Sequence, residues 1–242
     1  MFGLVRSWRR RRLLRSPIDP HWVSILDRRV PFFADFDDGV RQRFLDDLRV
    51  FVHEKHWIAA GGMQITDEVK VVIAAAAVRL TIFLSVDIYN RLTEIVVYPS
   101  HYVHESGETD TVVFGEAHDW GVVVLSWDAV LSGLANQDDG HDTAIHEFAH
   151  VLDRAGGAFN GTPQLRAHAH YRAWGRVMTE HFDRLREGDR SIRRTLRDYG
   201  ATNEAEFFAV ATESFFEKPE SMKKRAPDLY DELRRFYGFD PS

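Results

Sequence analysis

The apolar positions in the first third of the chain recur at helical spacing. From Asp35 to Lys55 they recur mostly every three or four residues among charged ones, which predicts an amphipathic helix with Asp35 or Asp37 as its N-cap. A second helix is predicted from Thr66 to Phe83. It is apolar on nearly every side, and a short helix with almost no polar face is expected to lie in the core.

The pattern changes to short strands in the middle of the chain. Segments 95–98, 111–114 and 121–127 are rich in β-branched and aromatic residues and are bounded by Gly, Asp or Pro, which predicts three strands. Helical patterns then return: a short helix over 128–134, one that starts near Asp142 or Thr143 and ends at Gly156-Gly157, a long amphipathic helix over 164–185, and one that begins after Thr202 or Asn203.

The helix that starts near Asp142 contains the sequence His146-Glu147-Phe148-Ala149-His150-Val151-Leu152-Asp153. Residues four apart share one face of a helix, so His146 and His150 can hold one ion, and Glu147 can reach its open side. Zinc suits this arrangement because it binds imidazole nitrogen and leaves a position for water in catalytic sites. The alternative is an ordinary helix with two hydrogen-bonded histidines, and a third ligand downstream decides between the two.

Two acidic residues on the helix after Asn203 are candidates for that third ligand. Glu206 and Glu213 are seven residues apart and therefore share one face of a largely apolar helix. Without a metal, Glu206 would complement the helix dipole in the first turn, and Glu213 would lie on a solvated face. Three further histidines are expected to serve the surface or helix packing and not the metal: His168, His170 and His181.

Length and composition limit the possible classes of protein. The 242 residues suffice for one domain with a sizeable core, and we expect a single domain over 1–242 with a basic arm at about 1–16. The net charge of -6 argues against direct nucleic-acid binding. The absence of cysteine excludes disulfides and thiolate zinc sites, so a metal must bind His, Asp or Glu, and it fits a cytoplasmic protein.

The basic arm at 1–16 contains six arginines. Arg15 directly follows Leu13-Leu14, so the apolar run of a secretory signal is missing, and the chain has no apolar stretch of about 20 residues that would span a membrane. Two interpretations stay open. The arm either touches an anionic surface or partner, or it is a solvated helix or frayed terminus.

Two sequence blocks together resemble a known family. The block at 146–153 and the block Asn203-Glu204-Ala205-Glu206-Phe207-Phe208-Ala209-Val210 resemble the Mlc titration factor A family of zinc peptidases. The likeness continues through Trp120-Gly121 and Leu125-Ser126-Trp127, and the second block also resembles the catalytic domain of anthrax lethal factor. The resemblance implies that His146, His150 and Glu206 bind Zn²⁺, that Glu147 is the general base, and that Tyr199 is the oxyanion partner.

One position departs from the lethal-factor pattern. That pattern has a second acid four residues after the ligand glutamate, where this chain has Val210. Asp153 and Glu213 are the candidates for an acid that supports the metal ligands instead.

These observations predict an α+β fold, a mostly helical single domain with a small sheet beside the zinc-binding helix. The predicted function is zinc-dependent hydrolysis of peptide bonds by a metal-activated water, with Glu147 taking the proton and Tyr199 stabilising the oxyanion. If a strand such as 122–125 borders the cleft, it can pair with an extended peptide. The resemblance suggests aminopeptidase-like activity. The alternative is a regulatory protein that sequesters a transcriptional repressor, as the family name implies, but binding alone requires neither Glu147 nor Tyr199.

Overall fold

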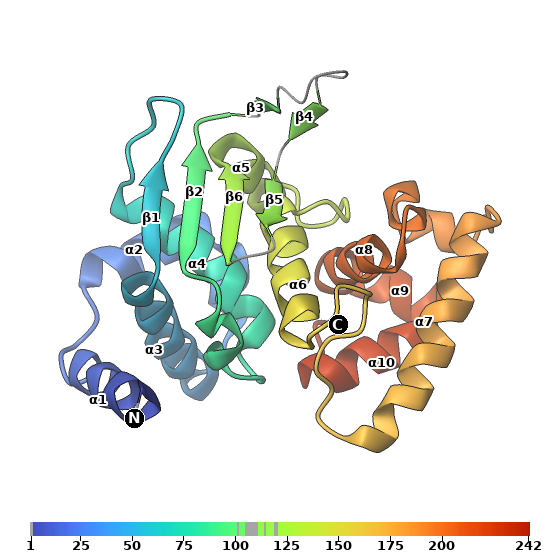
Figure 1. Ribbon diagram of the computed structural model, residues 1–242, viewed down its shortest axis with the longest axis horizontal. Coiled ribbons are helices and arrows are strands. Elements are labelled where there is room, and N and C mark those ends of the chain that lie inside the picture. Colours follow the sequence, from blue (N-terminus) through green and yellow to red (C-terminus); the bar gives the residue numbers. More distant parts are fainter. Residues whose placement is uncertain (1, 101, 105–110, 114, 119–120) are drawn as a thin grey trace.

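The computed structural model of the protein describes residues 2–100, 102–104, 111–113, 115–118 and 121–242 (Figure 1). In this part of the chain, ten α-helices accompany a four-stranded sheet and a separate two-stranded one. The predicted α+β class, mostly helical with a small sheet, is therefore confirmed.

Four helices from the first third of the chain pack together: α1 (Phe2–Leu13), α2 (Pro20–Arg29), α3 (Asp38–Glu54) and α4 (Asp67–Thr81). Asp37 caps α3 by accepting a hydrogen bond from the Val40 N–H, whereas Asp35 ends the 3₁₀-helix η1 (Pro31–Asp35). The Thr66 hydroxyl caps α4. As predicted, α4 is buried almost along its whole length, because it packs against α2, α3 and α6.

The sheet has the strand order β1-β2-β6-β5, with β1 (His56–Ala59), β2 (Glu94–Tyr98), β6 (Val122–Ser126) and β5 (Gly115–His118). The first three strands are parallel, and β5 runs antiparallel to β6. The second sheet pairs β3 (Tyr102–His104) with β4 (Thr111–Val113), and Phe114 of the predicted strand lies outside the described residues.

Strand β6, considered above for pairing with a peptide, lies inside the sheet. Its backbone pairs with β2 on one side and with β5 on the other, so it has no edge left for a peptide. The outer strand on this side of the sheet is β5, which lies beside the motif helix (Figure 1). Strand β1 was not predicted, because only its two central residues, Trp57 and Ile58, are large and apolar.

The remaining helices follow the last strand: α5 (Trp127–Ala135), α6 (Thr143–Ala155), α7 (Tyr171–Arg186), α8 (Glu204–Glu217), α9 (Pro219–Arg225) and α10 (Pro227–Tyr237). Helix α7 begins later than predicted, after the 3₁₀-helix η3 (His168–His170), because the segment before it is a loop whose Leu165 N–H donates to the Tyr171 hydroxyl. The other 3₁₀-helices are η2 (Val86–Asn90), η4 (Ile192–Arg194) and η5 (Asp198–Ala201).

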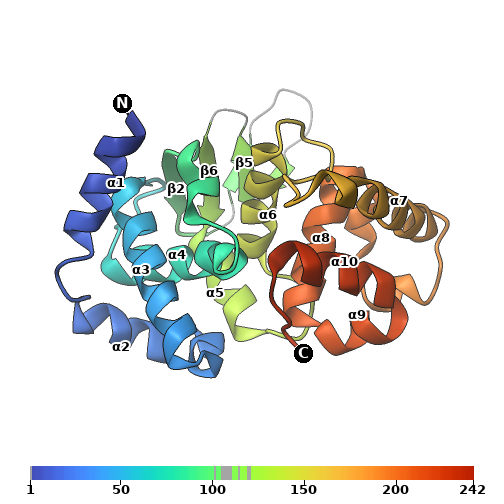
Figure 2. The ribbon, with the colours of Figure 1, turned by 90° about the horizontal axis from the view of Figure 1, so that it is seen from below.

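Buried apolar residues from α2 through α10 form one continuous cluster. At its centre, Phe51 of α3 meets Phe148 of α6 edge to face, with ring centroids 5.7 Å apart. Figure 2 shows α1 and α2 at one end of the molecule and α7 and α9 at the other, with α6 between them. In the part of the chain that the structure describes, every helix is too short or too polar to span a bilayer.

Candidate metal centre

Helix α6 carries both motif histidines into the interior. It begins where the Asp142 carboxylate accepts a hydrogen bond from the Ile145 N–H at 2.9 Å, and it ends at Gly156. Its next turns are buried on nearly all sides, because α6 packs against α4, α8 and the sheet. Polar side chains buried in this way need strong partners, and these come from α8.

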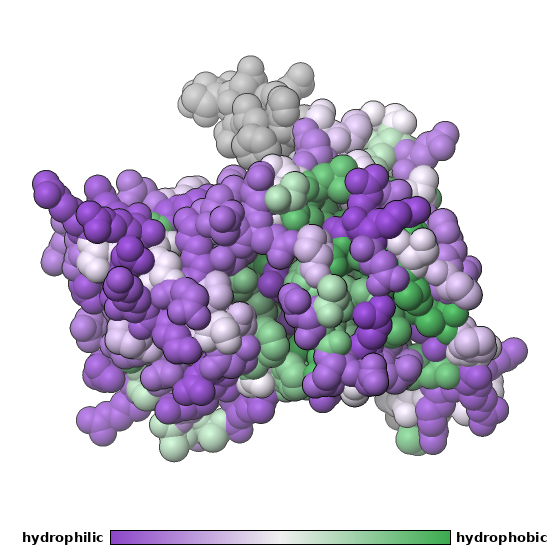
Figure 3. All heavy atoms as spheres, turned by 180° about the vertical axis from the view of Figure 1, so that it is seen from behind, coloured by the Kyte–Doolittle hydropathy of each residue, from purple (hydrophilic) through white to green (hydrophobic). Residues whose placement is uncertain are grey.

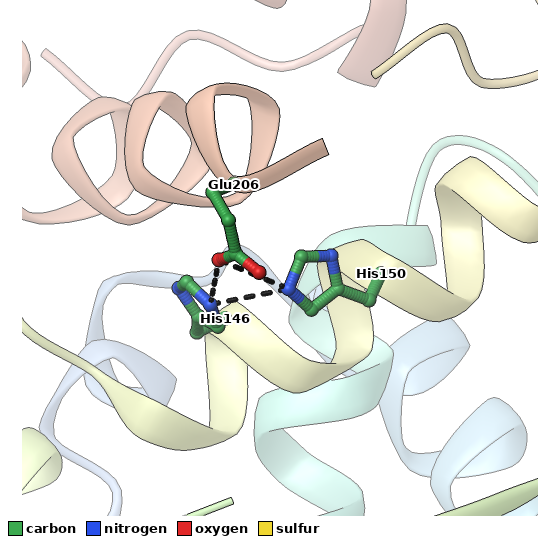
Figure 4. Close-up of side chains that lie close together, drawn as sticks. All are labelled: His146, His150 and Glu206. Atoms are coloured by element: carbon green, nitrogen blue, oxygen red, sulfur yellow. Dashed lines mark hydrogen bonds and ion pairs between the residues drawn. The ribbon is translucent and has the colours of Figure 1, made fainter. Parts of the chain in front are cut away.

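Helix α8 supplies the acid that faces the two histidines. The Asn203 side chain caps α8 by accepting a hydrogen bond from the backbone N–H of Glu206 itself, at 2.9 Å, which fixes the first turn of the helix. The Glu206 carboxylate then points across to α6 (Figure 4). Its Oε2 lies 3.0 Å from Nε2 of His146 and 3.4 Å from Nε2 of His150, and the two Nε2 atoms are 3.2 Å apart.

The contact between Glu213 and His146 prepares Nε2 of His146 for a metal ion. Oε1 of Glu213 lies 2.7 Å from Nδ1 of His146, and a carboxylate at this position favours a proton on Nδ1. Nε2 is then the nitrogen that a metal ion would bind, in place of the second proton that the ring carries without one. This Nε2 faces the Glu206 oxygen and Nε2 of His150, so a cation among the three atoms would contact all of them. Two imidazole nitrogens and one carboxylate oxygen within 4.8 Å of one another are a donor set typical of catalytic zinc.

The charges of the three side chains agree with this conclusion. Burial lowers the pKa of His146, but its hydrogen bonds with Glu206 and Glu213 outweigh burial and raise the pKa to about 10. Burial raises the pKa of Glu206, but its contacts with His146 and His150 lower it to about 2. Burial lowers the pKa of His150. The site thus holds an ionised carboxylate and stabilises a positive charge beside it, which is the charge that a divalent metal ion would supply.

Glu213 occupies the position behind His146 and is itself held firmly. Its side chain has no exposed surface, and Arg197 donates to both of its oxygens at 2.6 and 2.8 Å. The backbone N–H of Asp142 donates to Oε2 at 2.9 Å. Of the two acids left open as supports for the ligands, Glu213 is the one in contact with a histidine of the motif. The alternative expected for Glu213, a place on a solvated face, is wrong, because α8 turns this face toward α6.

Asp153 lies one turn beyond His150 but holds a loop and not a ligand. Its Oδ2 accepts a hydrogen bond from the Gly161 N–H at 2.8 Å. Gly161 has φ +72°, and a Cβ there would lie 2.3 Å from the carbonyl oxygen of Glu204 at the start of α8. The last acid of the motif thus fixes the loop after α6 against the helix that carries Glu206.

Two further predicted residues lie at the same place. Glu147 is 5% exposed and follows His146 on α6. Tyr199, in η5, is 52% exposed, and its ring centroid lies 5.9 Å from that of His146. Burial, followed by the negative charges of Glu206 and Glu147, raises the pKa of Tyr199, so its hydroxyl keeps its proton at neutral pH.

Two residues of the site were not predicted from the sequence. Arg197, which binds Glu213, stands in an irregular segment without periodicity, and its Nε also donates to the Gly140 carbonyl at 3.2 Å. Phe159 lies in the loop after α6 with its ring centroid 5.0 Å from that of His150, and it is 43% exposed. The Arg154 guanidinium also lies over the Phe159 ring, 4.6 Å from its centroid. Neither residue forms part of a spacing pattern that could have revealed it.

The three other histidines considered as ligands serve different contacts. His181 is buried, and its Nε2 lies 2.8 Å from Asp228. Nε2 of His170 lies 3.1 Å from Glu232, and His168 lies beside Tyr171. Among the described residues, His146, His150 and Glu206 are the group of potential ligands whose donor atoms converge.

Comparison with known proteins covers almost the whole chain. The model of the glucose-regulated metallo-peptidase M90 family matches residues 5–238. An uncharacterized protein of Synechocystis is 37% identical over 97% of this chain and 90% of its own length. Two proteins named Mlc titration factor A, from Serratia proteamaculans and Edwardsiella ictaluri, are 27% and 29% identical, each over 88% of this chain and 85% of its own length. The similarity therefore extends far beyond the motif helix.

Proposed function

Because this chain belongs to the glucose-regulated metallo-peptidase family M90, the family of the Mlc titration factor A proteins, we propose that it is a zinc-dependent peptidase. His146, His150 and Glu206 are the proposed zinc ligands. The observation that carries the proposal is the convergence of their three donor atoms within 4.8 Å, with Glu147 beside the first histidine. A peptidase family implies a metal ion and a peptide substrate, and the donor set favours zinc among the metals.

The proposed chemistry divides among the residues around the three ligands. Zinc, when bound, supplies Lewis-acid activation of water and of a peptide carbonyl near neutral pH. Glu147 accepts the proton of the attacking water and passes it to the leaving amine. The Tyr199 hydroxyl, which keeps its proton, donates to the oxyanion that develops on the carbonyl oxygen. Glu213 and Arg197 fix the ring of His146, so that its Nε2 stays directed at the site.

An extended peptide is the proposed substrate, and β5 is the proposed strand that pairs with it. The strand runs along the outside of the sheet beside α6, where main-chain hydrogen bonds could hold a peptide across the site (Figure 1). Aminopeptidase-like action rests on the family resemblance alone. Cleavage of matched peptides with free and acetylated N-termini would test it, because an aminopeptidase cleaves the free form only.

The Mlc titration factor A name suggests a regulatory alternative, in which the protein sequesters a transcriptional repressor. Glu147 and the Tyr199 ring beside the three ligands favour catalysis, since sequestration requires neither. The absence of cysteine supports a cytoplasmic location as part of the same proposal.

The decisive experiment compares metal content and peptide cleavage in two variants and one control. His146→Ala should lose the zinc that wild-type protein retains. Glu147→Gln should retain zinc but lose at least about 100-fold in turnover, because a general base contributes about 100- to 10,000-fold. Glu204→Gln changes an exposed acid in the first turn of α8 and should alter neither property. Wild-type protein without zinc, or a zinc-loaded Glu147→Gln variant with normal turnover, would overturn the proposal.

A further inference from the structure

Helix α1 exposes apolar side chains that the rest of the protein leaves uncovered. Leu4 is 76% exposed, Val5 47% and Trp8 56%. Leu4 and Trp8 are four residues apart and so lie on one face, which Arg11 and Arg12 continue in the next turns. The Arg12 guanidinium lies over the Trp8 ring, 5.8 Å from its centroid. The outer face of α1 therefore combines apolar residues in its first turns with arginines in its last.

The opposite face of α1 fixes the helix to the body of the protein. Arg10 forms a two-pronged contact with Glu54, with Nε and Nη2 at 2.6 and 2.7 Å from its oxygens, and its Nη1 lies 2.6 Å from Asp87. Arg49 of α3 donates to the carbonyl oxygens of Leu13 and Ser16 at 2.5 and 2.7 Å. These bonds hold the last turn of α1 and the residues after it, so the exposed face has a fixed orientation.

The charge of α1 runs against that of the whole chain. The first 16 residues contain six arginines and no acidic residue, whereas the chain as a whole carries -6, so the remainder carries twice that negative charge. Five of these arginines are exposed: Arg6, Arg9, Arg11, Arg12 and Arg15. The helix lies at one end of the molecule (Figure 2), and at the lower right of Figure 3, where α1 lies, hydrophilic surface surrounds small apolar areas.

We propose that α1 docks the protein on a membrane surface that contains anionic lipids. Arg9, Arg11 and Arg12 would contact the lipid headgroups, while Leu4 and Trp8 enter the interface. Tryptophan and short apolar segments flanked by basic residues favour the membrane interface. Their apolar part enters the lipid layer there, while their polar part stays hydrated. Arginines gain free energy from the negative surface potential only within about 10 Å of the membrane surface. At that range α1 lies in the attractive field, whereas most of the acidic remainder of the protein lies outside it.

A membrane fits this surface better than a nucleic acid does. A flat anionic surface meets only the end of the molecule that carries α1. A flexible polyanion would also approach the acidic remainder, and it offers no apolar layer for Leu4 and Val5. The exposed apolar residues thus distinguish the two occupants, and the experiment below separates them.

Vesicle flotation with the full chain tests the proposal. Wild-type protein should float with vesicles of phosphatidylcholine that contain about a third phosphatidylglycerol, and it should not float with phosphatidylcholine alone. Arg11→Gln combined with Arg12→Gln should weaken binding about 25-fold, or about fivefold per arginine. Leu4→Ala combined with Trp8→Ala should weaken it at least about fivefold through lost insertion.

A matched control removes equal charge from the other end of the molecule. Arg172→Gln combined with Arg190→Gln changes two exposed arginines at α7 and the turn after it, and it should leave vesicle binding unchanged. All four positions of the test variants are exposed, so unfolding curves should match that of wild type. Absence of flotation with anionic vesicles would overturn the proposal. Equal weakening of vesicle binding by the α1 and α7 arginine pairs would also overturn it. The same holds if the protein binds single-stranded DNA more tightly than vesicles and the Leu4 and Trp8 changes have no effect.

Discussion

Nδ1 of His146 lies 2.7 Å from Oε1 of Glu213, and this contact joins α6 to α8 directly behind the proposed metal ligands. The carboxylate is inaccessible to solvent and is bound by Arg197 and by the Asp142 N–H. With a proton on Nδ1 held against Glu213, Nε2 is the nitrogen of His146 that a metal ion would bind. The contact also shows how Glu213 can support a metal ligand although the position four residues after Glu206 is Val210. Two helical turns after Glu206, α8 again faces α6, and Glu213 lies on that face.

Glu213→Gln should therefore weaken zinc binding. An amide can donate where the carboxylate accepted, so the ring of His146 loses its fixed tautomer, and loss of such a partner costs about 10- to 100-fold in metal affinity. Competition with a chelator of known zinc affinity measures the change. Glu217→Gln, one turn further along α8, alters an acid whose carboxyl oxygens make no hydrogen bond among the described residues, and it serves as the control. Equal zinc affinity of Glu213→Gln and wild type would show that the contact does not support the ligand.

Tyr199→Phe should separate binding from chemistry. The ring lies beside His146 without being one of the three ligands, so the variant should retain its zinc. If the hydroxyl meets the developing oxyanion, its removal costs about 3 to 4 kcal/mol in the transition state, and kcat should fall much more than KM rises. Steady-state kinetics of the zinc-loaded variant measure both constants. A change confined to KM would remove Tyr199 from the catalytic residues.

How much of this site follows from the sequence depends on how local each contact is. The pairing of His146 with His150 is set by four residues of one helix, and strong N-caps at Asp142 and Asn203 mark the two helices that matter. The choice between Glu206 and Glu213 could not be made from spacing, because both share one face of α8. Only the way α8 crosses α6 places Glu206 at the Nε2 atoms and Glu213 at Nδ1.

The errors in the sheet have the same origin. The apolar pattern identifies β6 as a strand, but its neighbours are chosen by pairings between distant segments, and the short antiparallel β5 takes the outer position. Strand β1 is too short to show an alternation, and it forms because its backbone pairs with β2. Helices α3 and α4, by contrast, were predicted closely, since their caps and periodicity lie within each segment.

Phe159→Ala should change substrate selection more than turnover. The ring packs on His150 and still exposes 43% of its surface, so it forms a half-open apolar wall beside the ligands. Removal of the wall should raise KM for peptides with a large apolar side chain next to the cleaved bond by at least about fivefold, and leave small side chains less affected. A series of peptides that differ at this one position provides the measurement. Trp8→Ala removes an exposed aromatic ring of α1 and should leave every KM unchanged, and an equal KM rise for small and large side chains in Phe159→Ala would exclude selection by the ring.

Glu217 should make the stability of the protein depend on pH. It is 5% exposed, and among the described residues neither of its carboxyl oxygens has a hydrogen-bond partner. Burial, followed by the charges of Asp142 and Glu213, raises its pKa from the ordinary 4.5 to about 9. The folded state therefore binds the proton more tightly than the unfolded state, so the contribution of this group to stability is full below 4.5 and is lost as the pH rises toward 9.

Glu217→Gln tests this directly, because an amide of similar shape is neutral at every pH. Between about pH 4.5 and pH 7, the free energy of unfolding of wild type should fall by about 3 kcal/mol relative to the variant, since each pKa unit corresponds to about 1.4 kcal/mol. Urea unfolding across this range measures both proteins. Glu220→Gln, an exposed acid on α9, should follow the wild-type curve. Parallel curves for wild type and Glu217→Gln would mean that the Glu217 carboxyl is ionised in the folded protein, with Arg79, whose positive charge lowers the pKa of Glu217, as its counter-charge.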